Sequence, residues 1–321
     1  MLNKLMKGGF FLNGKFYPPI AGGAGPSVSG TPLASEPTVW SARILEYLDK
    51  AYMYVQALTN RNYEGEAKKG GTVKAFYVSD VTVTDYTGAW TDADWETLGD
   101  NAVTVQIDKE KKVLIKVPAV RENFSMLQLI DQGSQRAAVA IGDVIDQAIA
   151  ANYSSIVAGN AYGDDITPIT VGLGAGQVSP TVALARLRET LVTARAPHTN
   201  PRVVVPEWFG TMLYIELSGR VTQLGDAATR GEFAVDTGPM APVSGLTPYV
   251  SPNVPNTAGA KYKVMAGDPM ITFASAIDML DTVQLINDFA TGVRGLWVWG
   301  SKLPRGEYMA LGTFNKGAYG A

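Results

Sequence analysis

The sequence predicts a mixed α+β fold with elements that reach beyond one compact domain, and three observations between residues 40 and 156 lead to this expectation. Apolar residues at helical spacing predict an amphipathic helix over 40–57. A long polar β-hairpin follows up to about residue 117, and a single helix of about thirty residues then extends from about 125 to 156. Such a helix is about 45 Å long, which is longer than the diameter of the core of one compact domain. We therefore expect the long helix and the hairpin to contact neighbouring copies of the same chain.

The composition excludes several classes of protein. With 321 residues and 46% hydrophobic content, the chain can bury a sizeable core. Its formal net charge is −3 and it has no basic stripe, which argues against sequence-specific nucleic-acid binding, although a shell that encloses DNA need not be basic. The absence of cysteine excludes disulfides, thiolate catalysis and zinc–thiolate sites, and fits a reducing cytoplasm. No apolar run approaches the roughly 18 residues of a membrane span, so no membrane partner is expected.

The first 37 residues form a predicted arm that is rich in Gly, Pro and Ser. In isolation such a segment could not bury enough apolar surface to stay ordered, so we expect a neighbouring subunit to hold it. Its apolar patch, Phe10 to Leu12, is too short for the apolar region of a signal peptide. Glu36 and Pro37 mark a helix start. Apolar side chains at helical spacing follow at Trp40, Ile44, Leu45, Leu48, Tyr52 and Val55.

The predicted hairpin begins after the glycine-rich segment 65–71, which turns the chain. This segment is no phosphate-binding loop, because Gly71 stands where the phosphate-binding lysine would be. Residues of strand-forming type predict strands over 72–78, 81–84, 103–107 and 113–117. The charged run 108–112 is predicted to be the turn between the last two strands.

The long helix is predicted to have one apolar face, formed by Leu127, Ile130, Ala137, Ile141, Val144, Ile145, Ala148 and Ile149. The opposite face is expected to carry Gln128, Gln132, Gln135, Arg136, Asp143, Asp146 and Gln147. Gly133 and Gly142 lower the helix propensity by up to about 1 kcal/mol each, so tertiary packing must support the helix there.

After Gly159 the long helical pattern is replaced by shorter predicted helices and strands, and we place a subdomain boundary there. Ser179 and Pro180 predict the start of a helix, a buried strand is expected over 202–205, and a second helix over 206–217. Five prolines make 218–260 a long loop with at most short strands. Further strands are predicted over 262–266, 270–274, 295–300 and 307–311.

No constellation of residues predicts an enzyme, a metal site or a cofactor. The one histidine, His198, lies in a proline-bounded loop without a second histidine, and is interpreted as an exposed loop residue. Asp92, Asp94 and Glu96 resemble the start of a calcium loop, but Val103 stands where its bidentate ligand would be. Asp164-Asp165 is interpreted as a turn.

Five segments follow one another along the chain: Trp40 to Lys50, Asn60 to Glu66, Gly71 to Lys74, the long helix, and Gly292 to Leu296. In this order they resemble the major capsid (coat) proteins of tailed bacteriophages. The resemblance implies the HK97-like capsid fold, an α+β fold. Its expected parts are an N-terminal arm (1–37), an N-terminal helix (38–59), an extended loop (60–118), a spine helix in the peripheral domain (119–159), an axial domain (160–290) and C-terminal strands (291–321).

The same resemblance implies a structural protein that self-assembles through hexamers and pentamers into an icosahedral phage head around double-stranded DNA. Its expected partners are its own copies, scaffolding and portal proteins, a possible decoration protein, and packaged DNA contacted without sequence preference. The expected location is the virion, with assembly in the cytoplasm of a bacterial host. The alternatives are an encapsulin-like compartment that packages enzymes and, further off, a phage tail or tube protein.

The tip of the extended loop is the predicted inter-subunit contact. Tryptophan is a frequent anchor of interfaces, and acids favour a basic counter-surface. The candidate residues are Trp90, Trp95, Asp92, Asp94 and Glu96 at the tip, with Glu64 and Glu66 at the start of the loop. One variant of the family crosslinks a lysine of this loop to an asparagine, but no lysine lies between Lys74 and Lys109, so that bond is not expected here. In the alternative interpretation, the tryptophans cover the hairpin's own apolar face.

Overall fold

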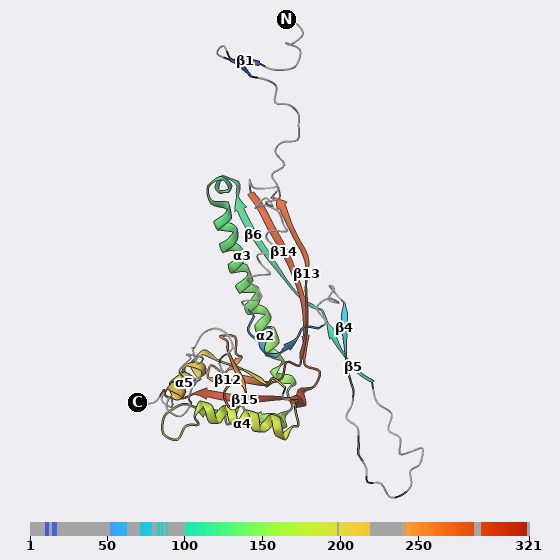
Figure 1. Cartoon of the computed structure of the whole chain (residues 1–321), viewed down its shortest axis with the longest axis vertical. Helices are drawn as coiled ribbons and strands as arrows, with labels where there is room; N and C mark the ends of the chain where they lie inside the picture. The colour runs from blue at the N-terminus through green and yellow to red at the C-terminus, as the bar shows by residue number, and fades with distance from the viewer. Residues whose placement is uncertain are drawn as a thin grey trace.

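The computed structural model shows an elongated molecule with a compact part at one end and a long part that rises from it (Figure 1). The structure describes residues 10–12, 15–17, 52–62, 71–78, 82–83, 85, 88, 100–197, 199–218, 240, 242–285 and 290–319. In the predicted arm only two short antiparallel strands are described, β1 (Phe10–Leu12) and β2 (Lys15–Tyr17). Residues 40–51 of the helix predicted over 40–57, and His198, lie outside the described residues.

The long part consists of one helix packed on a narrow sheet. The helix is α3 (Ala119–Ala150), which has 32 residues and is therefore about 48 Å long. The sheet has the order β3-β13-β14-β6, with bounds β3 (Thr59–Asn60), β13 (Ile271–Gln284), β14 (Ala290–Lys302) and β6 (Lys109–Pro118). The predicted long helix is present, but it begins near residue 119 instead of 125. It gives way to a short 3-10 helix, η4 (Ala151–Ser155), before reaching 156.

The buried face of α3 repeats at helical spacing and packs against β6 and β14. Ala138, Ile141, Ile145 and Ile149 are at most 5% exposed. On the sheet side, two tryptophans of β14, at positions 297 and 299, are almost fully buried. Two expectations were wrong: Val144 is 37% exposed and lies off the apolar face, and Asp146, expected on the polar face, is 1% exposed.

The hairpin is shorter than predicted. Its two strands are β4 (Thr72–Val78) and β5 (Asp100–Gln106), which pair antiparallel along their whole length. The strand after them, β6, pairs with β14 and not with β5, so the predicted turn at 108–112 is instead the start of an edge strand. The charged run misled the prediction because edge strands of sheets are themselves rich in lysine. Thr82 and Val83, predicted as strand, have no regular structure.

The compact part is built on a seven-stranded sheet with the main order β10-β9-β12-β15-β7, to which β11 and β8 add at the side. The strands are β7 (Ala161–Tyr162), β8 (Ile169–Val171), β9 (Arg202–Val205), β10 (Thr247–Val250), β11 (Asn256–Thr257), β12 (Lys261–Gly267) and β15 (Met309–Lys316). Helix α4 (Pro180–Thr193) packs on β15 and β12, and α5 (Glu207–Ser218) packs on β10. These two helices and the buried strand β9 confirm the predictions for this region, including the apolar face Leu184, Leu187 and Leu191.

The chain passes from one part to the other three times. It enters the compact part after α3, returns to the long sheet at β13, and comes back through β15 after β14. The expected boundary at 290 therefore falls inside the antiparallel pair of β13 and β14. Both strands extend well beyond the predicted ranges 270–274 and 295–300.

A short helix, α2 (Tyr54–Leu58), lies where the two parts meet (Figure 1). Residues 52 and 53 precede it without helical structure, so the helix predicted over 40–57 does not run unbroken to its end. Tyr54, Ala57 and Leu58 are fully buried, which makes α2 part of the core that joins both parts. None of the described helices is both long enough and apolar enough to cross a membrane.

Candidate assembly surfaces

The predicted contact residues cannot be placed in the structure. They lie outside the described residues: Trp90, Trp95, Asp92, Asp94, Glu96, Glu64 and Glu66. Close to the tip, Val83 is described and is 94% exposed, which is unusual for so apolar a side chain. The contact role of the tip therefore stays a prediction, and what the structure does show is how the hairpin leaves the body.

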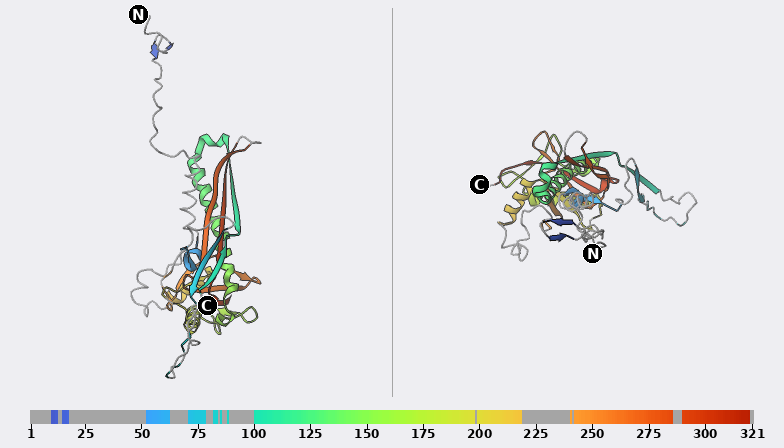
Figure 2. Two further views of the ribbon diagram at one scale, coloured as in Figure 1. Left: turned by 90° about the vertical axis from the view of Figure 1, so that its right-hand side faces the viewer. Right: turned by 90° about the horizontal axis from the view of Figure 1, so that it is seen from above.

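The root of the hairpin is anchored on the long sheet, on the face opposite α3. Val73, Val105 and Ile107 are at most 2% exposed and form an apolar cluster with two residues of the sheet, Ala274 and Val298. The approach is close at Gly300 of β14, because a Cβ atom there would lie 2.2 Å from the carbonyl oxygen of Gln106. The hairpin thus starts from a fixed position and projects beyond the body (Figures 1 and 2).

The chain reaches this root through α2, whose N-terminus is capped by a carboxylate of another helix. Asp146 of α3 accepts hydrogen bonds from the backbone N–H groups of Met53 (2.9 Å) and Tyr54 (3.2 Å). Burial raises the pKa of Asp146 to about 7, and the N–H donors of α2 pull in the opposite direction because they favour the charged form. The same burial, with the Asp146 charge as the second cause, raises the pKa of Tyr54 well above its ordinary value.

The other end of α2 is held by a cation. The Arg202 side chain, from β9 of the compact part, donates hydrogen bonds to the carbonyl oxygens of Gln56 and Ala57 in the last turn. An acidic side chain at the N-terminus of a helix and a basic side chain at its C-terminus both interact favourably with the helix dipole. A five-residue helix has no stability of its own in water, so these two contacts and its buried apolar side chains maintain it.

A second polar contact joins α3 to the compact part. Asn253, which follows β10, donates to Asp143 Oδ1 (2.9 Å) and accepts from Gln147 Nε2 (3.3 Å). Asp143, Asp146 and Gln147 are three and four residues apart and so share one face of α3. Part of the face that was predicted to be polar therefore forms the joint between the long part, the compact part and the root of the hairpin.

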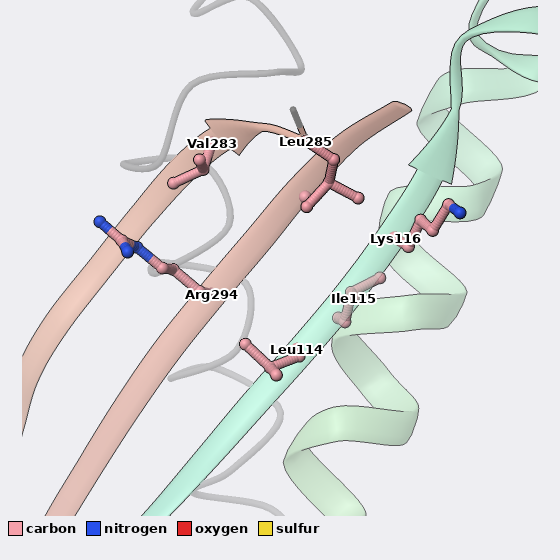
Figure 3. A pocket seen from close by; sticks show the side chains of 7 residues that line it. Leu114, Ile115, Lys116, Val283, Leu285 and Arg294 are labelled. Carbon is pink, nitrogen blue, oxygen red and sulfur yellow. The ribbon is translucent and has the colours of Figure 1, made fainter. Parts of the chain in front are cut away.

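A groove lies on the long sheet, near the end farthest from the compact part (Figure 3). It has a volume of about 260 Å³ and is lined by Leu114, Ile115, Lys116, Val283, Leu285, Gly292 and Arg294. Its walls are mostly apolar, and Leu114 is 66% exposed.

The described residues offer no group of three or more His, Asp or Glu side chains that could hold a metal ion. Asp164 and Asp165 form the predicted turn. Asp164 accepts hydrogen bonds from the N–H groups of Ile166 and Thr167, and these bonds lower its pKa. Asp165 pairs with the buried Lys263 at 2.8 Å.

Sequence reasoning missed the two carboxylates that cap helices from a distance. Besides Asp146, Glu216 of α5 accepts hydrogen bonds from the N–H (3.0 Å) and the hydroxyl (2.6 Å) of Thr181, at the start of α4. A usable signal existed for Asp146, because it stands three residues before the buried Ile149 and therefore borders the apolar face. Nothing in the sequence indicated its partner Met53, which lies 93 residues earlier in the chain.

Comparison with known families and structures agrees with this architecture. The sequence profile of a family described as phage capsid protein matches residues 100–310. This range is more than half of the chain, and the protein therefore belongs to the phage capsid protein family. No curated protein matches the chain in sequence.

Three solved structures illustrate the fold. A chain of Mycobacterium phage Che8 is 22% identical, with a TM-score of 0.54, over 80% of this chain and 89% of that chain. The capsid of cyanophage P-SCSP1u gives 14% identity and a TM-score of 0.58 over 81% and 86%. The capsid of Ralstonia phage GP4 is 13% identical, with a TM-score of 0.57, over 82% of this chain and 90% of that chain. At such low identities these likenesses show the fold alone, which is the predicted HK97-like capsid fold.

Family and fold together define the class of this protein. It is a structural protein of a phage capsid, a component of the virion that assembles with copies of itself into a shell.

Proposed function

We propose that the chain is the major capsid protein of a tailed phage, whose copies form hexamers and pentamers that build an icosahedral head around double-stranded DNA. The observation that carries this proposal is the match of the capsid family profile to residues 100–310, the range that holds the long helix and most strands of the two large sheets. With a net charge of −3, the chain would contact DNA without a dedicated binding site. Assembly would take place in the cytoplasm of a bacterial host, with scaffolding and portal proteins as partners and a decoration protein as an optional one.

In this proposal the compact part is the axial domain and the long part is the peripheral domain. The division follows the sheets: residues from about 156 to 270 and from about 303 onward belong to the compact part, while α3, β6, β13 and β14 form the long part. The hairpin β4–β5 and the segment 79–99 between its strands form the extended loop. The arm before residue 38 would be held by neighbouring subunits.

The contents of the native particle test the enclosed genome. The proposal predicts that particles purified from infected cells protect double-stranded DNA from nuclease. Particles that contain packaged enzyme and no DNA would contradict it and support an encapsulin-like compartment instead. Tubes in place of shells would identify a tail component.

The tip of the extended loop is proposed to dock on a neighbouring subunit with its tryptophans desolvated. Replacing Trp90 and Trp95 together by alanine should abolish or strongly weaken shell formation, as measured by sedimentation, while circular dichroism shows unchanged helicity of the subunit. Tryptophan is enriched among the few interface residues whose truncation costs about 2 kcal/mol or more.

The matched control replaces two exposed aromatic residues outside the hairpin, Tyr214 (44% exposed) and Tyr319 (39% exposed), by alanine. These substitutions are expected to leave assembly closer to normal. Normal and equally stable shells from the tryptophan double variant would contradict docking through the tip. That result would favour tryptophans that cover the hairpin's own apolar face.

A further inference from the structure

The short helix α2 is held at its two ends by the two different parts of the subunit. Its first N–H groups donate to Asp146 of α3, in the long part, and its last carbonyl oxygens accept from Arg202 of β9, in the compact part. In the chain, α2 comes between the predicted arm and the hairpin. A change at either end of α2 therefore changes how firmly this stretch of the chain is attached to the body.

The contact at the first end uses a carboxylate that is almost out of reach of water. Asp146 is 1% exposed, and aspartate is almost never so deeply buried unless it is paired. Its two oxygens accept hydrogen bonds from the backbone N–H groups of Met53 (2.9 Å) and Tyr54 (3.2 Å). Because these donors carry no charge, they offset only part of the cost of burying a negative one.

Among the described residues no cation pairs with this carboxylate. Its neighbour Asp143, one turn earlier on α3, is itself negative and acts against the charge of Asp146. On the side of the long sheet that faces α3, β6 carries two lysines in register with the buried tryptophans of β14, and neither forms an ion pair with Asp146. The titratable groups on the surrounding elements are Tyr52 before α2, Tyr54 of α2, Asp143 of α3, Lys109 and Lys111 of β6, and Arg202 of β9.

A proton on Asp146 changes the balance of this contact. The neutral carboxyl group has no buried charge and keeps a carbonyl oxygen that accepts an N–H bond. The charged group is more stable in water than at the joint, because burial raises the pKa of Asp146 from the ordinary 3.8 to about 7. A helix of five residues has no stability of its own once one end is detached. Loss of the proton therefore favours detachment of the first turn of α2.

We propose that Asp146 is a proton-controlled latch between α3 and α2. With the proton bound, the carboxyl group holds the first turn of α2 on α3. Without it, the carboxylate moves into water and the first turn leaves α3, while Arg202 keeps the last turn on the compact part. The proton is exchanged with the solvent. The latch is a property of the single subunit and goes beyond the proposed function, so it can be tested without assembly.

Hydrogen exchange of the unassembled full chain measures how often the latch opens. The amide of Ala57 reports on it, because this N–H bonds to the carbonyl oxygen of Met53 at 2.9 Å. Its protection factor, corrected for the intrinsic exchange rate at each pH, should fall roughly fiftyfold from pH 5 to pH 7 and level off above 7. In Asp146→Asn, which is neutral throughout, it should change less than about threefold. A wild-type profile as flat as that of the variant would overturn the proposal.

Low concentrations of urea distinguish the latch from unfolding of the whole subunit, because only global unfolding exposes a large surface. Below the unfolding transition, the protection of α2 should be nearly independent of urea, whereas that of the buried strand β12 should decrease steadily. If α2 follows β12 in its protection and its urea dependence, the proton acts on the whole fold and the local latch is overturned.

A matched variant alters the other end of α2. Arg202→Gln weakens the contact with the compact part and leaves Asp146 in place. It should lower the protection of α2 by a constant factor at every pH, so that the profile keeps its shape and levels off at the same pH. A profile that loses its pH dependence in Arg202→Gln would mean that the arginine governs the response, and would overturn the assignment to Asp146.

Discussion

At the scale of single residues, the molecule depends on carboxylates that act on helices other than their own. Asp146 of α3 caps α2, and Glu216 of α5 caps α4. In each case the buried carboxylate satisfies backbone N–H groups that a helix start leaves without partners. The Asp146 contact matters more for function, because α2 leads directly to the strand β3 and then to the root of the hairpin.

The raised pKa of Asp146 makes a prediction about stability and pH. Its pKa is about 7 in the folded protein and 3.8 ordinarily, so the folded state binds this proton more tightly than the unfolded state. The contribution to stability is fully present below pH 4, decreases as the pH rises toward 7, and stays low above 7. Between these limits the slope approaches about 1.4 kcal/mol per pH unit.

Asp146→Asn removes this titration. Urea unfolding of the unassembled wild type and of the variant is measured from pH 4 to pH 8. The free energy of unfolding of the wild type minus that of the variant should fall as the pH rises. The sign is the test, because the substitution also changes stability by a constant amount through the altered hydrogen bonds. A difference that is flat across this range, or that rises with pH, would show that the carboxylate is charged throughout.

Residues of this kind mark the limit of prediction at this scale. The apolar face of α3 was predicted from its spacing, and Ile141, Ile145 and Ile149 are buried as expected. Asp146 was assigned to the wrong face because a carboxylate is ordinarily exposed, and only a partner far away in the chain makes its burial favourable. The contact role of Trp90 and Trp95 at the tip is predicted from the sequence alone.

At the scale of elements, the hairpin and the edge strand β6 show how charge patterns mislead. Lys109, Lys111 and Lys112 suggested a turn, yet these residues pair with β14 in the long sheet. A lysine-rich strand and a charged turn have the same composition, and only the pairing partner distinguishes them. The helices α4 and α5 were predicted well because proline at the start and apolar spacing are local signals.

Two glycines of β14 provide a matched test of how the hairpin is seated. At Gly300 an added Cβ atom would lie 2.2 Å from the backbone of Gln106, while at Gly292 the nearest atoms are at 3.5 Å. Gly300→Ala should therefore destabilise the subunit by about 2 kcal/mol or more, because the hairpin root must move off the sheet. Gly292→Ala should be neutral or stabilise by up to about 1 kcal/mol.

Chemical denaturation of the two unassembled variants measures this difference. Hydrogen exchange adds a local readout, since in Gly300→Ala the amides of β4 and β5 should lose protection before those of α3. Equal stability of the two variants would mean that the hairpin root is not seated against β14 as described.

At the scale of the whole molecule, the account describes a subunit made for contacts with its own copies. Its long part and its projecting hairpin extend beyond the compact part, as expected of a subunit in the phage capsid protein family. The α+β class and the long helix could be predicted because they depend on local periodicity. The return of the chain to the long sheet at β13 and β14 could not, since β14 pairs there with β6, which lies far earlier in the sequence.

Electron microscopy of the full chain expressed alone tests the central claim most directly. The account predicts closed polyhedral shells of uniform size, and loss of these shells when the tip of the extended loop is altered. A chain that remains monomeric under all assembly conditions, or that forms open tubes, would contradict it.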